Sequence, residues 1–124
     1  MIQTIVVDTS AILSIFEERV SLEGQLRELV GETNIVVPSA VREELSAIDS
    51  VESRSASALA SKYGTWSCTE RGDEGVIESA VKMNAFAVVT NDSILAGRLV
   101  RMGIRVIRMK GRKKFGFYKS DEVQ

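Results

Sequence analysis

Four acidic side chains recur along this sequence, each shortly after a run of apolar or β-branched residues. They are Asp8, Glu44, Asp73 and Asp92. Such runs are typical of buried strands in a parallel sheet, and the strands of a parallel sheet end at the same edge, where ligands bind. The spacing therefore predicts that the four carboxylates meet at one edge of the domain.

Carboxylates that meet in this way need a counter-charge. Two of them about 4 Å apart repel by roughly 4 kcal/mol at an effective dielectric constant near 20, so either some bind protons or a cation neutralises them. The chain has no histidine and one cysteine, Cys68, which excludes a Ser-His-Asp triad, a Cys-His pair and a zinc site with histidine ligands. Oxygen ligands suit Mg²⁺ or Mn²⁺, and carboxylate-held ions of this kind commonly act on phosphodiesters.

Helical phase selects one acid from each of two neighbouring pairs. Glu44, rather than Glu43, lies beside the apolar stripe of its predicted helix. On the next acid-bearing helix, Asp73 lies near the middle of the stripe and Glu74 just outside it. We therefore expect Glu44 and Asp73 to face the cleft and Glu74 to lie within reach of it.

Each of these acids also has a purely structural explanation. Asp8 suits a turn acceptor and Asp92 a helix N-cap. An acid such as Asp73 in a first helical turn interacts favourably with the helix dipole, and Glu44 is of a residue type common in helices. The residues alone leave both explanations open.

The elements that must position these acids alternate along the chain. Short apolar or alternating runs predict five strands, at residues 4–7, 34–38, 65–68, 86–89 and 104–109. Amphipathic segments between them predict helices, and strands that alternate with helices form right-handed βαβ units. We therefore predict an α/β fold, a three-layer sandwich with a parallel five-stranded Rossmann-like sheet whose last strand lies at an edge. The domain spans 1–109, and a tail follows at 110–124.

Charge is distributed unevenly along the chain. Residues 1–97 carry 7 Lys and Arg against 15 Asp and Glu, whereas residues 98–124 carry 9 against 2. The segment 110–120 interleaves five cations with three aromatic rings, a pattern that favours contact with single-stranded RNA. The cations expected to make this contact are Lys110, Arg112, Lys113 and Lys114. The alternative is a solvated tail, or one that packs on the body or on a second subunit.

Length and composition set further limits. A chain of 124 residues suits one domain, and its apolar runs are far shorter than the roughly 18 residues of a membrane span. The first residues have the pattern of a strand rather than a signal peptide, and a single cysteine forms no internal disulfide. We therefore expect a cytoplasmic protein with no membrane partner.

Four stretches of the sequence together resemble the PIN-domain family of metal-dependent ribonucleases. They are IVVDTSAIL, VPSAVREEL, GDEGVIESA and VVTNDSIL, and the resemblance covers residue 1 to about 109. It implies four metal-binding acids, Asp8, Glu44, Asp73 and Asp92. It also implies that Glu74 is a further metal-binding acid, although the family's ribosomal RNA processing nucleases often have Asp at this place. The supporting polar residues would be Thr9, Thr90 and Asn91.

The resemblance implies a Rossmann-like sheet, one or two Mg²⁺ or Mn²⁺ ions and endonucleolytic cleavage of RNA. Members of the family act in ribosomal RNA processing or as toxins of toxin–antitoxin pairs, so the implied partners are a second copy of the chain and an antitoxin or a ribosome-assembly protein. Our mechanistic hypothesis is that Asp8, Asp73 and Asp92 hold one ion, directly or through water, while Glu44 holds or orients a second. In-line attack by water would leave a 5′-phosphate and a 3′-hydroxyl.

Two other classes of protein compete with this interpretation. A non-catalytic RNA- or protein-binding PIN-like module would keep the fold and the basic segment but need no metal. A phosphatase or phosphotransfer domain fits less well. Haloacid-dehalogenase-like enzymes need an Asp where Ser10 stands, and receiver-like domains need a Lys at the end of a late strand, where none occurs before Lys110.

Overall fold

The structure is a computed structural model that describes residues 2–111 and 113–119. Its core is a six-stranded sheet in the order β3-β2-β1-β4-β5-β6. The strands are β1 (Gln3–Val7), β2 (Thr33–Pro38), β3 (Gly64–Trp66), β4 (Ala87–Val89), β5 (Arg105–Met109) and β6 (Phe115–Phe117). The helices are α1 (Thr9–Glu17), α2 (Leu22–Leu29), α3 (Ser39–Ala47), α4 (Val51–Ala60), α5 (Gly72–Lys82) and α6 (Ser93–Arg101). Within the described residues, none of these helices is long and apolar enough to cross a membrane.

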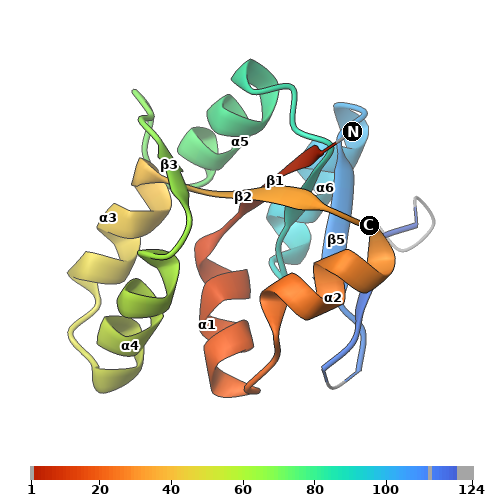
Figure 1. The fold of residues 1–124 in the computed structure, drawn as a ribbon. Coiled ribbons are helices and arrows are strands. Elements are labelled where there is room, and N and C mark those ends of the chain that lie inside the picture. Colours follow the sequence, from red (N-terminus) through yellow and green to blue (C-terminus); the bar gives the residue numbers. More distant parts are fainter. Residues whose placement is uncertain (1, 112, 120–124) are drawn as a thin grey trace.

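Helices cover both faces of the sheet, which confirms the predicted α/β architecture. Figure 1 shows α1 and α2 on one side of the sheet and α5 on the other, with α3 and α4 stacked at one end. The helix α3 packs against both α4 and α5. These contacts bring the first turns of α1, α3 and α5 toward the same edge of the sheet.

The strand β1 lies at the centre of the sheet because it is apolar on both faces. Ile5, Val6 and Val7 are each 0% exposed, as expected of a parallel strand covered by helices on both sides. It pairs in parallel with β2 on one side and with β4 on the other. The strand order therefore reverses between β1 and β4, and open α/β sheets bind ligands at such a point, beyond the carboxyl ends of the strands.

The sheet has one strand more than the sequence predicted. β6 pairs with β5 in antiparallel register, with Phe117 opposite Ile107 and Phe115 opposite Met109. The segment 104–109 is therefore not at the edge, and 115–117 belong to the sheet rather than to a separate tail. Phe115 is 9% exposed, and its N–H donates to the Gln25 Oε1 atom on α2 at 3.1 Å. A three-residue strand in a basic segment has too weak a hydrophobic pattern to be recognised before this contact is known.

A glycine sets the distance between α3 and α5. A Cβ atom built on Gly75 would lie 2.5 Å from the Ala40 Cβ atom and 2.7 Å from the carbonyl oxygen of Glu70. Because no side chain fits there, α5 can approach α3 closely. This approach brings the first turn of α5, which carries Asp73, toward the helix that carries Glu44.

We predict that Gly75→Ala destabilises the protein. Ala gains about 1 kcal/mol in helix propensity, but overpacking against backbone typically costs 1–3 kcal/mol, so we expect a net loss of about 1 kcal/mol or more in the free energy of unfolding. Urea unfolding measures this, with Ser46→Ala on the exposed side of α3 as the control, expected to lie within about 0.5 kcal/mol of wild type. A Gly75→Ala protein as stable as wild type would show that the two helices are not in forced contact.

Candidate active site

A buried hydrogen bond joins the carboxyl ends of β1 and β4. The Thr90 hydroxyl donates to the Asp8 Oδ2 atom at 2.6 Å, and the two residues are 0% and 5% exposed. The Thr90 Oγ1 atom also accepts a hydrogen bond from the backbone N–H of Asp92 at 3.0 Å. Thr90 therefore holds Asp8 and the Asp92 backbone in a fixed relation at the point where the strand order reverses.

Asp8 and Asp92 each cap a helix. The Asp8 Oδ1 atom accepts from the backbone N–H of Ala11 at 3.0 Å, in the first turn of α1. The Asp92 Oδ1 atom accepts from two backbone N–H groups of the first turn of α6, at 2.9 and 3.1 Å. The Asp92 Oδ2 atom makes no hydrogen bond with any residue that the structure describes. Capping and ligand binding are therefore compatible, because one oxygen orients the carboxylate and the other stays available.

Two further polar residues tie the strand ends together. The Ser10 hydroxyl donates to the Asp8 Oδ1 atom at 2.9 Å and accepts from the backbone N–H of Asn91 at 3.1 Å. The Asn91 side-chain oxygen accepts from the backbone N–H of Met109 at 3.0 Å, which links this loop to β5. The sequence motifs predict Thr90 and Asn91 as supporting residues, but they do not indicate Ser10. Its signal is a hydroxyl two residues after an acid that begins a helix.

Glu44 reaches the same edge from α3. Its Oε1 atom accepts from the Thr9 hydroxyl at 2.7 Å, across to the first turn of α1. Both Glu43 and Glu44 are exposed, but Glu44 is the one that turns toward α1. This is the side expected from helical phase, and it leaves the second carboxylate oxygen of Glu44 open to solvent.

Asp73 lies within the electrostatic field of the other acids. Partial burial raises the pKa of the Asp73 carboxyl, and the charges of Asp92, Glu44 and Glu74 raise it further, whereas Arg98 lowers it. Arg98 also forms an ion pair with Glu74, with 2.6 Å between its Nη2 atom and Glu74 Oε1. No sequence pattern indicates Arg98, because only the tertiary structure brings its side chain near these acids.

Glu78 organises the loop that leads into α5. Its carboxylate accepts from the Thr69 N–H at 3.0 Å, the Thr69 hydroxyl at 2.9 Å and the Glu70 N–H at 2.9 Å. These hydrogen bonds, the one from Glu70 first, hold the pKa of the Glu78 carboxyl below its usual value. The sequence gives no signal for Glu78, since an acid in the middle of a helix does not reveal which loop it contacts.

Burial and hydrogen bonding have opposite effects on the pKa of the Asp8 carboxyl group. Desolvation raises the pKa of Asp8 from 3.8 to about 6, while hydrogen bonds from Thr90, Ala11 and Ser10 oppose the shift and the charge of Asp92 adds to it. Ionisation of Asp8 in the folded protein therefore lowers the free energy of unfolding by about 3 kcal/mol at neutral pH. A cation beside the carboxylate would remove that cost.

The acids offer the donor chemistry of a hard divalent cation. Asp8 Oδ2 accepts one hydrogen bond, and Asp73 makes no hydrogen bond or ion pair within the described part of the chain. Across residues 2–111 and 113–119, however, no three Asp, Glu or Cys side chains are close enough to form a ligand set by themselves. Mg²⁺ commonly binds one or two carboxylates and keeps several waters, so this arrangement fits it better than it fits Ca²⁺, which takes six to eight oxygen ligands.

The predicted RNA-contacting cations follow β5. The Lys110 N–H donates to the carbonyl oxygen of Lys114 at 2.6 Å, which closes the turn into β6. The Lys114 Nζ atom lies 3.5 Å from Glu28 Oε1 on α2, so this cation contacts α2. Lys113 is exposed, and Arg112 lies outside the described residues. Their contact with RNA stays a prediction.

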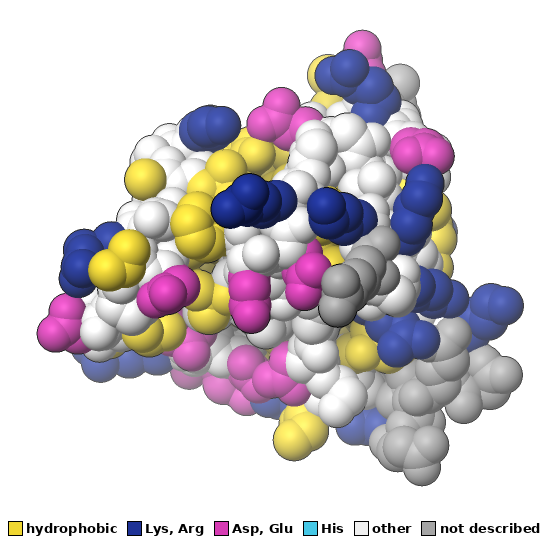
Figure 2. Space-filling view, turned by 90° about the horizontal axis from the view of Figure 1, so that it is seen from below, with side chains coloured by type: hydrophobic (Ala, Val, Ile, Leu, Met, Phe, Trp, Pro, Cys, Tyr) yellow, Lys and Arg dark blue, Asp and Glu magenta, His cyan; other side chains and the backbone are white. Residues whose placement is uncertain are grey.

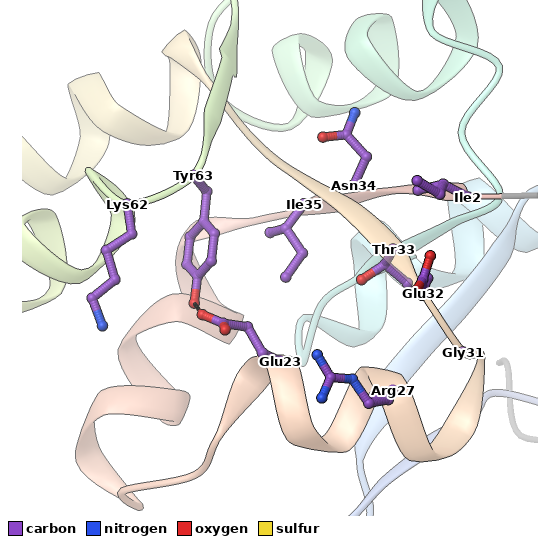
Figure 3. Close-up of a pocket in the computed structure, with 10 residues that line it drawn as sticks. All are labelled: Ile2, Glu23, Arg27, Gly31, Glu32, Thr33, Asn34, Ile35, Lys62 and Tyr63. Carbon is purple, nitrogen blue, oxygen red and sulfur yellow. Dashed lines mark hydrogen bonds between the residues drawn. The ribbon is translucent and has the colours of Figure 1, made fainter.

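A cavity of about 480 Å³ lies at the opposite edge of the sheet, where β1, β2 and β3 begin. Figure 3 shows Arg27, Lys62 and Glu23 on its walls, with the Tyr63 hydroxyl donating to Glu23 at 2.8 Å. Its charges are mixed, and none of the predicted site residues lines it. The candidate site is therefore the acidic strand edge and not this cavity.

The family of the chain follows from comparison with known proteins. The family model described as a PIN like domain matches residues 5–112. The chain belongs to this family. The match confirms the family that the sequence motifs indicated, and the parallel sheet with its acids at the switch point is the arrangement that was expected of the PIN-like domain.

Two solved structures share the fold of this PIN-like domain. The PIN domain endonuclease Utp24 matches with a TM-score of 0.80 and 21% identity, over 92% of this chain and 90% of that chain. The catalytic core of Rad2, solved in complex with a DNA substrate, matches with a TM-score of 0.51 and 13% identity, over 97% of this chain and 47% of that chain. No curated protein sequence matches. The chain therefore shares the fold of these two structures.

We predict that Asp8→Asn stabilises the metal-free protein at neutral pH. Asn caps helices as well as Asp does but carries no charge, so the variant avoids the loss of stability that ionisation of buried Asp8 causes. That loss is absent below about pH 4, grows as the carboxyl ionises and is complete above the folded-state pKa of about 6. We expect the difference in free energy of unfolding to rise from near zero at pH 4 to as much as about 3 kcal/mol at pH 7.

Urea unfolding in EDTA at several pH values measures this difference. The control is Asp49→Asn, at a carboxylate whose side chain is 100% exposed, and we expect little change there. An Asp8→Asn protein whose stability tracks wild type across the whole pH range would show that the Asp8 carboxylate is not desolvated.

Proposed function

We propose that this protein is a Mg²⁺- or Mn²⁺-dependent endoribonuclease that hydrolyses phosphodiester bonds at the carboxyl edge of its sheet. The observation that supports the proposal is that Asp92 lies within electrostatic range of both Asp8 and Asp73, and Glu44 within range of Asp73, at one edge of a PIN-like fold. Desolvation and mutual repulsion raise the pKa values of Asp8 and Asp73, and such perturbed acids are a mark of functional sites.

Asp8, Asp73 and Asp92 would hold the ion, in part through water, and Glu44 and Glu74 would bind its outer water shell or a second ion. The chemistry that such an ion supplies is activation of water for in-line attack on phosphorus and neutralisation of charge on the leaving oxygen. Because Oδ1 of both Asp8 and Asp92 is fixed by helix N–H groups, these two acids keep their orientation without a ligand.

The supporting residues keep the acids in place. Thr90 orients Asp8, Asn91 ties the Asp92 loop to β5, and Thr9 orients Glu44. Arg98 neutralises Glu74 in the free protein, and a change of its side-chain rotamer would let it contact a substrate phosphate. Thr90, Asn91 and Thr9 act only by positioning an acid, so their loss should weaken activity less than loss of Asp8 or Asp92.

We favour RNA as the substrate because the acidic edge lies in the same domain as a basic segment with aromatic residues. Lys110, Arg112, Lys113 and Lys114 would contact its phosphates. The proposal covers two cellular roles, ribosomal RNA processing with an assembly partner and toxicity controlled by an antitoxin, in a cytoplasmic protein that can form a homodimer.

A non-catalytic RNA- or protein-binding module is the second candidate. One observation favours it, namely that no ready ligand set exists among the described side chains. The two candidates differ in whether the acidic edge binds a divalent ion and whether the protein breaks a phosphodiester bond.

We predict that Asp8→Asn and Asp92→Asn each lower the rate of RNA cleavage by about 100-fold or more, because each removes a charge that the ion needs. The assay uses end-labelled RNA with Mn²⁺ and examines product ends, which should carry a 5′-phosphate. The matched control is Glu43→Gln, which makes the same kind of change one position from Glu44 on the exposed face of α3. Either Asp variant cleaving like wild type would remove that residue from the site.

We also predict that a divalent ion stabilises the wild-type protein but not Asp8→Asn. Ligand at 100 times its Kd adds about 2.7 kcal/mol, or about 10 °C in Tm for a domain of this size. Thermal melts with and without Mn²⁺ measure the shift, and Glu43→Gln should behave as wild type. A wild-type protein that Mn²⁺ does not stabilise, and that binds none by calorimetry, would favour the non-catalytic module.

A further inference from the structure

A groove runs along the amino ends of β4 and β5, at the opposite edge of the sheet from the acids. It consists of two cavities of about 460 and 310 Å³ that share Phe86, Gly103, Ile104 and Arg105. One cavity extends to Phe117 and Tyr118, and the other to the ends of α5 and α6. We call this the Phe86 groove.

Aromatic rings and guanidinium groups are stacked along the Phe86 groove. The Phe86 and Phe117 rings meet edge to face, with 6.4 Å between centroids and 71° between planes. The Arg105 Cζ atom lies 4.4 Å from the centroid of the Phe86 ring, and the Arg108 Cζ atom lies 4.6 Å from that of Tyr118. Phe86, Phe117 and Tyr118 are half-buried, so their rings are anchored while part of each stays open to solvent.

The surroundings of the Phe86 groove are positively charged. The ends of α5 and α6 that border the groove carry Lys82 and Arg101, both exposed, Arg105 lines both cavities, and no acid lines either cavity. Figure 2 shows the opposite, carboxyl edge of the sheet, where acidic and basic side chains both lie on the surface. Positively charged residues beside a groove favour a polyanion as its ligand over an apolar protein segment.

We propose that the Phe86 groove binds single-stranded RNA, with an unpaired base stacked against the Phe86 and Phe117 rings and the Arg105 guanidinium, and with the neighbouring cations on its phosphates. Rings and guanidinium planes accept any unpaired base, and cations that follow the backbone supply sequence-independent affinity. The inference deepens the proposed function and rests on it for the identity of the ligand.

The location of the groove gives it a distinct role from that of the acids. The two sites lie at opposite ends of the sheet, about one strand length or roughly 16 Å apart. A base held in the groove would anchor a strand whose other part reaches the acids. The groove therefore binds substrate at a distance from the bond that is cleaved, and it should favour long, unpaired substrates over short ones.

The test is the affinity of the full chain for a labelled single-stranded RNA of about 12 nucleotides, measured by fluorescence anisotropy in EDTA. We expect Phe86→Leu and Arg105→Gln each to raise Kd by about tenfold, the lower part of the range for loss of one stacked base. The matched controls are Phe16→Leu, at an exposed ring on α1, and Arg54→Gln, at an exposed guanidinium on α4, which should change Kd by less than about twofold. Circular dichroism and thermal melts establish that each variant is folded.

A fluorescent base analogue distinguishes base stacking in the groove from purely electrostatic binding. An RNA with 2-aminopurine in place of one base should lose fluorescence on binding to wild type and keep it with Phe86→Leu. Single-stranded DNA and duplex RNA are further arms of the experiment, and weaker binding of both supports the commitment to unpaired RNA.

Failure of the groove and failure of the nuclease proposal are distinguishable. If Phe86→Leu and Arg105→Gln bind the 12-mer as the controls do, or if the duplex binds more tightly, the Phe86 groove is not an RNA site, whatever the protein cleaves. If the wild-type protein cleaves no RNA, the binding experiment in EDTA still tests whether the groove binds RNA. If both proposals hold, Phe86→Leu should slow cleavage of the 12-mer but not of a dinucleotide, which is too short to reach both sites.

Discussion

The hydrogen bond between Thr90 and Asp8 is the contact on which the rest of the candidate site depends. It joins the ends of two neighbouring parallel strands, β1 and β4, on either side of the point where the strand order reverses. Because the same threonine oxygen receives the backbone N–H of Asp92, the positions of two acids are set by a single side chain. The apolar strand β1, fully covered by helices, supplies the rigid base for this arrangement.

The buried Asp8 carboxylate lowers the stability of the fold. Desolvation raises the pKa of Asp8 to about 6 in spite of three hydrogen bonds, and burial together with repulsion from neighbouring acids raises the pKa of Asp73. Proteins retain such groups where an activity requires them, since a neutral side chain would be more stable. The cation that relieves this repulsion in our proposal would therefore act both in catalysis and in stability, which couples metal binding to folding.

The two ends of the sheet carry different functional groups. Acids lie beyond the carboxyl ends of β1 and β4, whereas Arg105, Arg108 and two half-buried rings, Phe117 and Tyr118, come from the last quarter of the chain and lie at β5 and β6. The sixth strand is what makes this possible, because it carries Phe117 and Tyr118 back beside Phe86. In our interpretation an RNA strand is anchored in the Phe86 groove and presented to the metal at the acidic edge.

The sequence by itself determined the strands β1 to β5, the helices between them, the α/β class and the family, because hydrophobic periodicity and the order of acid-bearing motifs are local patterns that survive without coordinates. It also placed Asp8, Asp73, Asp92 and Glu44 at strand ends, because the edge of a parallel sheet follows from topology. Only the tertiary structure decided how Ser10, Glu78 and Arg98 contact this edge, and that the basic segment forms a strand. These features depend on contacts between residues far apart in the chain and on glycine-permitted helix packing, and no local pattern encodes them.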